Sequence, residues 1–127
     1  MNDVAQRIHD RLILLQRDES TVRRQLQTLE NTIHTTTSTM HHLEFKSISD
    51  ATRDSDPHGS VLHDAVELRR QRANVKQAES DAVHLKEKLK KIETLINSHT
   101  FWEDYATTTD LSRQNEAQDW FKHPISY

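Results

Sequence analysis

Apolar residues recur at alternating intervals of four and three residues, and this spacing constrains the fold more than any other feature of the sequence. An average interval of 3.5 residues is the period of a coiled coil, and here it extends over about five heptads. We place Leu12 at heptad position a and Leu15 at position d. The apolar seam positions in the first half of the chain are Ile8, Leu12, Leu15, Val22, Leu26, Leu29, Ile33, Met40 and Leu43.

A second heptad series follows a polar interruption at residues 50–59, which holds the only glycine and one of the two prolines. Its apolar seam positions are Val61, Leu68, Val75, Ala78, Ala82, Leu85, Leu89, Ile92 and Ile96. Two such series joined by a short polar loop predict an all-α, antiparallel helical hairpin over residues 1–99. Two extended helices that pair with another copy of the chain are the alternative.

The expected helices span about residues 3–49 and about residues 60–98. Asp3 is the expected N-cap of the first helix, and Gln6 would complete a capping box. With the loop centred near residue 55, residues whose numbers sum to about 110 should face each other across the hairpin.

Residues 100–127 form a separate short helical, aromatic-rich segment, predicted to pack near the open end of the hairpin as a small head. Thr100 and Glu103 have the spacing of a capping box, which predicts that a new helix starts there. Asp110 is the expected N-cap of a last helix at about Leu111–Lys122.

Ile13 and Leu14 fall at outward heptad positions b and c, and adjacent exposed aliphatic side chains favour a cover. We expect Trp120 and Phe121 to cover them, with Trp102 as a further candidate. Two interpretations stay open, a local core and a partner-binding surface. The candidate residues for that surface are Ile13, Leu14, Phe101, Trp102, Tyr105, Trp120 and Phe121.

Composition fits a helical stripe better than a compact globule. Apolar residues make up 33% of the chain and charged residues 29%, whereas globular domains average about 45–50% apolar residues. The periodicity and a net charge of only −3 argue against disorder. The absence of cysteine excludes disulfides, and the apolar run Leu12–Leu15 is too short for a signal peptide or membrane span. We therefore expect an intracellular protein, cytoplasmic or nuclear.

The sequence contains few residue patterns that would support metal binding, phosphate binding or catalysis. None of the nine histidines pair at the i, i+4 spacing of helical zinc sites. A single glycine excludes a glycine-rich phosphate loop, and two paired helices offer no deep pocket for a small-molecule substrate. The prediction is a protein that is not an enzyme and has no cofactor or metal. His99 at a d position would make stability depend on pH.

The charged residues of the second helix and the polar residues of the seam indicate which kinds of partner to expect. The second helix has basic clusters at Arg69, Arg70, Arg72 and Lys76 and at Lys86, Lys88, Lys90 and Lys91. Interleaved acidic residues argue against nucleic-acid binding, which favours an unopposed basic face. The seam is interrupted by Glu19, Thr36, Asp64 and Gln71, and polar seam residues set register and partner choice.

The leading hypothesis is therefore a coiled-coil structural or adaptor subunit that binds other helical proteins or further copies of itself. A chaperone or stalk component that holds a partner helix is the second hypothesis. Nucleic-acid binding through the basic face is the third.

Overall fold

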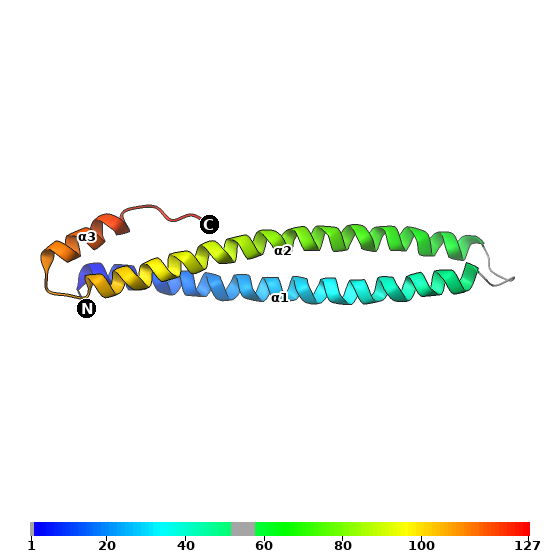
Figure 1. Ribbon diagram of the computed structural model, residues 1–127, viewed down its shortest axis with the longest axis horizontal. Helices are drawn as coiled ribbons and strands as arrows, with labels where there is room; N and C mark the ends of the chain where they lie inside the picture. The colour runs from blue at the N-terminus through cyan, green and yellow to red at the C-terminus, as the bar shows by residue number, and fades with distance from the viewer. Residues whose placement is uncertain (1, 52–57) are drawn as a thin grey trace. The chain divides into compact units, whose positions relative to one another are not determined.

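A computed structural model describes residues 2–51 and 58–127 of the chain. It contains three helices, α1 (Asp3–Ala51), α2 (His58–Ala106) and α3 (Leu111–Phe121), and the described residues include no strand. Helices α1 and α2 lie side by side and antiparallel (Figure 1). This confirms the all-α helical hairpin. Residues 52–57 of the predicted loop lie outside the described residues. Helix α1 continues to Ala51 and α2 begins at His58, so each helix extends two residues into the predicted loop of residues 50–59.

The hairpin divides into two compact units. Unit 1 comprises Met1–Arg24 and Leu85–Tyr127, and unit 2 comprises Gln25–His84. Bridging pairs in each unit follow the predicted register, with numbers that sum to about 110. In unit 1, Arg11 Nε lies 2.7 Å from His99 Nε2. In unit 2, Lys46 Nζ lies 3.7 Å from Asp64 Oδ1.

The seam of unit 1 is well buried. The a and d residues of α1 in this unit are fully or almost fully buried, except for the half-buried Glu19. They are Ala5, Ile8, Leu12, Leu15 and Val22. On α2, Ile92, His99 and Ala106 are buried, and Leu85, Leu89 and Ile96 are half-buried.

The seam of unit 2 is less complete. Every a and d position of α1 in this unit whose side chain is described is only half-buried. These residues are Leu26, Leu29, Ile33, Thr36, Met40 and Leu43. On α2, Asp64, Leu68 and Ala82 are buried, whereas Gln71, Val75 and Ala78 are half-buried. The side chain of Val61, the first predicted seam residue of this series, lies outside the described part.

Asn2, and not Asp3, caps the start of α1. Its Oδ1 accepts a hydrogen bond from the backbone N–H of Ala5 at 2.9 Å, which is the standard N-cap contact. Gln6 donates to Asp10 one turn onward, so the predicted capping box is wrong. The Nδ2 of Asn2 also donates to the carbonyl of Ala106, at 2.6 Å. One side chain thus satisfies backbone groups at the start of α1 and the end of α2.

Helix α2 continues through Thr100, where we expected a new helix to start. The Thr100 hydroxyl donates to the carbonyl of Ile96, four residues earlier, at 2.9 Å. A threonine hydroxyl inside a helix can bond in this way without ending it. The heptad also continues, with Glu103 at position a and the buried Ala106 at position d. Packing against α1 therefore overrides the local capping signal.

Helix α3 begins where the sequence indicates. Asp110 has an extended backbone, and its carboxylate accepts a hydrogen bond from the Ser112 N–H at 2.9 Å. The helix ends at Phe121, one residue before the expected Lys122. It places Ala117, Trp120 and Phe121 against the first turns of α1.

Candidate interaction surfaces

Within unit 1, a small apolar core joins all three helices. Its buried members are Ala5 and Ile8 from α1, Ala106 from α2 and Ala117 from α3. Four partly buried hydrophobic residues pack around it, namely Val4, Trp102, Trp120 and Phe121. Small alanines at the centre let the helices approach closely, and the larger side chains close the edge. Trp102, Trp120 and Phe121 are therefore part of a local core.

The expected cover over Ile13 and Leu14 is wrong. Ile13 is 42% exposed and Leu14 is 54% exposed. The aromatic side chains of α3 pack instead beside Val4 and Arg11, at heptad positions g of α1, on a different face from positions b and c. Ile13 and Leu14 thus remain an exposed aliphatic pair.

The aromatic residues form a connected cluster that ends at the surface. The rings of Trp102 and Trp120 stack with centroids 5.4 Å apart and an interplanar angle of 14°. Phe101 packs edge-on against Trp102 and stacks on Tyr105, yet it remains 59% exposed. The Tyr105 hydroxyl donates to Glu116 of α3 at 2.5 Å, which raises the pKa of Tyr105. Of this cluster, Phe101 is the side chain most available to a partner.

Arg11 and His99 form the polar centre of the same region. His99 is fully buried, and its ring meets Trp120 edge-on with centroids 4.7 Å apart. The Arg11 guanidinium lies 4.0 Å from the centroid of the Phe121 ring and 5.6 Å from that of Trp120, and it also donates to the Phe121 carbonyl at 3.1 Å. Burial lowers the pKa of His99, and the positive charge of Arg11 lowers it further, against a hydrogen bond to the Leu95 carbonyl that raises it.

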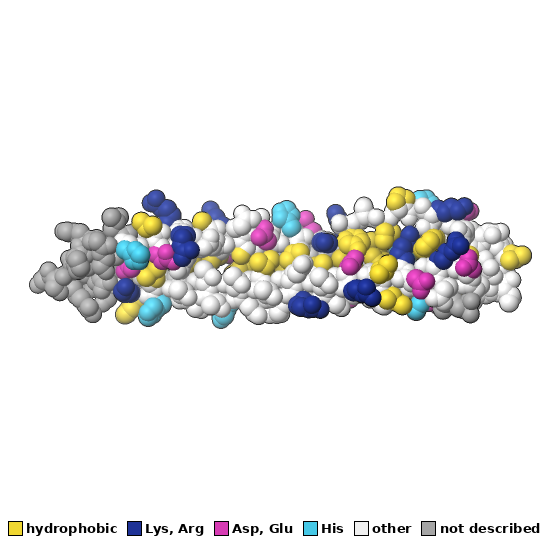
Figure 2. All heavy atoms as spheres, turned by 180° about the vertical axis from the view of Figure 1, so that it is seen from behind, with side chains coloured by type: hydrophobic (Ala, Val, Ile, Leu, Met, Phe, Trp, Pro, Cys, Tyr) yellow, Lys and Arg dark blue, Asp and Glu magenta, His cyan; other side chains and the backbone are white. Residues whose placement is uncertain are grey.

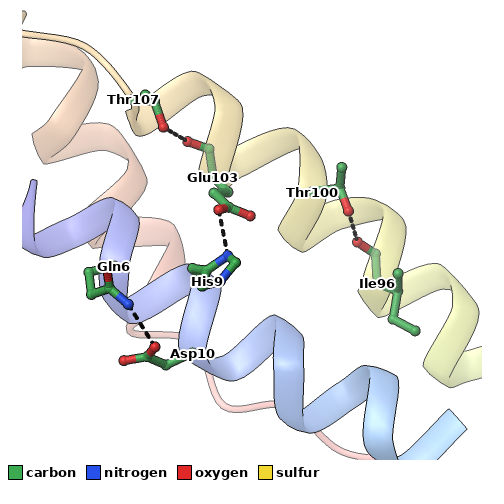
Figure 3. A network of polar contacts seen from close by, with 7 residues as sticks. All are labelled: Gln6, His9, Asp10, Ile96, Thr100, Glu103 and Thr107. Carbon is green, nitrogen blue, oxygen red and sulfur yellow. Dashed lines mark hydrogen bonds and ion pairs between the residues drawn. The ribbon is translucent and has the colours of Figure 1, made fainter. Parts of the chain in front are cut away.

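A second polar contact bridges α1 and α2 next to this centre (Figure 3). His9 Nδ1 lies 2.7 Å from Glu103 Oε1. The view shows Glu103 on the same stretch of α2 as Thr100, with its side chain pointing toward His9. This contact and the Asn2 cap join the start of α1 to the end of α2.

Unit 2 has an open groove along its half-buried seam. The groove has a volume of about 440 Å³ and is lined by Met40, Arg72, Ala73, Val75 and Lys76. Figure 2 shows hydrophobic side chains at the surface in a line along the middle of one face. The apolar floor comes from both helices, and the two cations of α2 form its rim.

In the described part of unit 2, two acceptor oxygens are buried without a hydrogen-bond partner. They are Oδ2 of Asp64 and Oε1 of Gln71, which occupy successive d positions of α2. A buried acceptor left unpaired costs roughly 1–3 kcal/mol. Both residues interrupt the seam of the sequence pattern, and the structure shows that α1 does not fully satisfy them.

Part of the basic cluster on α2 is neutralised by neighbouring carboxylates. Arg72 pairs with Glu44 of α1 at 3.0 Å, and Arg70 pairs with Glu67. The hydrogen bond from Arg70, supported by one from Gln71, holds the pKa of Glu67 at about 2. These pairs reduce the unopposed positive charge that binding to a phosphate backbone needs.

Sequence reasoning did not find every residue of these surfaces. Arg11 carries no motif, and only its contacts with His99 and Phe121, about 90 to 110 residues away in the chain, reveal its role. Asn2 lay beside the predicted cap and was detectable, since asparagine is a favoured N-cap residue. The groove at Met40 could not be located, because a heptad pattern does not state how completely two helices bury their seam.

In residues 2–51 and 58–127, histidine and acidic side chains do not gather in groups of three or more, as a metal site would require. Among the described helices, none has a stretch long and apolar enough to cross a membrane. Comparison with known proteins gives no matching protein-family model, curated protein or solved structure.

Proposed function

We propose that the protein is a non-enzymatic coiled-coil structural or adaptor subunit, and that it assembles with a further helix along the seam of unit 2. The observation that carries the proposal is the half-buried seam from Leu26 to Leu43. In water, apolar side chains that two helices leave partly exposed gain free energy when a third helix covers them, at about 25 cal/mol per Å².

The groove at Met40 supports this proposal. Its floor of Met40, Ala73 and Val75 is apolar, which suits the apolar face of a helix in helix-in-groove recognition. Methionine adapts its shape to different partners. The lining contains no hydroxyl, thiol, imidazole or carboxylate group, so the proposal includes no catalysis at this groove.

The unpaired oxygen of the half-buried Gln71 gives the proposed interface a specificity element. A partner helix that offers a hydrogen-bond donor to a rotated Gln71 amide would remove the desolvation cost of this oxygen, whereas a purely apolar helix would not. This is how a polar seam residue selects a partner at some cost in stability of the unbound protein.

Site-specific photocrosslinking tests the proposal. A benzophenone amino acid replaces Met40 in the groove, or Ser38 on the exposed face of the same helix as the matched control. We expect discrete crosslinked species from position 40 and none from position 38, and mass spectrometry of the products separates a second copy of the chain from another helical protein. Equal crosslinking at both positions, or none at position 40, contradicts the proposed interface.

Light scattering after gel filtration gives an independent measurement. The chain mass is 14.9 kDa. A larger, concentration-dependent mass that falls to the monomer value when Ile33 is replaced by Asp indicates self-assembly through the seam. A monomer at all concentrations leaves other helical proteins as the partner class. A larger mass that Ile33→Asp does not change contradicts assembly through this seam.

A further inference from the structure

The hydrogen bonds of His99 require one particular neutral form of its ring. Nδ1 lies 2.6 Å from the Leu95 carbonyl oxygen, which can only accept, so Nδ1 carries the proton. Nε2 lies 2.7 Å from Arg11 Nε, whose N–H can only donate, so Nε2 must be the acceptor. Both ring nitrogens are therefore occupied, and the ring has no place for a second proton.

Arg11 links His99 to the end of α3. The same guanidinium that donates to His99 also donates from Nη1 to the Phe121 carbonyl and lies over the Phe121 ring. A change at His99 that displaces Arg11 therefore removes a charge-assisted hydrogen bond and a cation–π contact from the last turn of α3. The Trp120 ring touches His99 directly, so a change at His99 also affects the packing of Trp120.

We propose that Arg11 and His99 form a pH-sensitive latch, which holds the end of α3 against α1 while His99 is neutral and releases it when His99 is protonated. Protonation at Nε2 places an N–H donor against the Nε–H donor of Arg11. It also brings a second positive charge within hydrogen-bond distance of the first. The contact changes from a hydrogen bond to a repulsion, so Arg11 must leave.

Among the described residues, the groups that face His99 offer no compensating negative charge. From α1 it faces Arg11, and from α3 it faces the uncharged Trp120 ring. The carboxylate one turn along α2, Glu103, is already bonded to His9 of α1.

The direction of the pH effect follows from burial, which lowers the pKa of His99 in the docked state, with the charge of Arg11 acting in the same direction. In the undocked state the pKa returns toward the ordinary value of about 6.5. The undocked state therefore binds more protons near and below that pH. Docking is favoured above about pH 6.5, and it weakens by up to about tenfold for each pH unit below, until the pKa of the docked state is reached.

Tryptophan fluorescence reports this transition directly. Both tryptophans of the chain, Trp102 and Trp120, belong to the cluster that α3 closes. Between pH 8 and pH 5 we expect a red shift and a several-fold rise in acrylamide quenching, with a midpoint below pH 6.5. Circular dichroism at 222 nm should show that α1 and α2 stay helical over this range.

Three variants separate the latch from titration of the neighbouring His9. His99→Gln removes the titrating ring and should abolish the transition, whereas His9→Gln, which removes the adjacent histidine, should retain it. Arg11→Gln should reduce it, because a neutral amide can donate to neutral His99 and accept from protonated His99, which leaves only the effect of burial. Should His99→Gln not fold at pH 8, the Arg11→Gln result decides.

No fluorescence transition in the wild type overturns the latch. So does an unchanged transition in folded His99→Gln or in Arg11→Gln, or a transition that His9→Gln alone abolishes.

Discussion

The two units of the hairpin share one heptad pattern and differ in how fully they bury it. In unit 1, Ile8 is fully buried, and α3 packs beside it. In unit 2, Ile33 also occupies a seam position of the same helix, position a where Ile8 is at position d, and is only half-buried. Two antiparallel helices meet along a single stripe, and a third segment is needed to close its flank. In unit 1, α3 covers one flank of the seam, whereas α3 is not part of unit 2.

A matched pair of substitutions gives the largest test of this comparison. Ile8→Ala should lower the free energy of unfolding by about 2–5 kcal/mol, because it leaves a cavity in a closed core. Ile33→Ala should cost about 1 kcal/mol, because water already reaches that side chain. Urea denaturation followed by circular dichroism measures both, and equal losses would show that the two seams are equivalently buried.

Trp120→Ala tests whether α3 closes unit 1. We expect a loss of about 2 kcal/mol, less than for a fully buried tryptophan, since Trp120 is half-buried against Trp102 and His99. Leu111→Ala in the same helix is the control, because Leu111 is 70% exposed and its removal should change stability little. Similar effects of the two changes in urea denaturation would refute a closing role for α3.

The helix caps allow a smaller test. Asn2→Ala should destabilise unit 1 by about 1–2 kcal/mol, because it removes an N-cap and a hydrogen bond to the end of α2. Asp3→Ala should have a much smaller effect, since the Asp3 side chain is exposed and its ion pair with Arg7 lies at the surface. Thermal melts of the two variants measure the difference, and a larger loss for Asp3→Ala would restore it as the cap.

Gln71→Leu should have a still smaller effect, and a stabilising one. It should raise the local stability of the unbound protein around position 71 by up to about 1 kcal/mol, because it replaces a buried unpaired oxygen with apolar atoms of similar volume. Hydrogen exchange of residues around position 71 measures the change. If Gln71 selects the partner, the same variant should weaken the proposed assembly. Destabilisation of the chain alone would mean that Gln71 is satisfied within the hairpin.

The presence of the helices, their register and the start of α3 can be predicted from the sequence alone. These features follow from local rules, because a heptad places its apolar residues on one stripe and Asp110 caps a helix through its own neighbours. Each described position that the heptad assigned to the seam is buried or half-buried.

Three features depend on tertiary packing: the side of the seam that α3 covers, the continuation of α2 through Thr100, and the contact between Arg11 and His99. The sequence suggested Ile13 and Leu14 as the covered pair, but the cover lies at Val4, Ile8 and Arg11. The physical reason is that both flanks of a two-helix seam are compatible with one heptad. The choice between them depends on the packing of Trp120 and Phe121 against residues about 110 positions away.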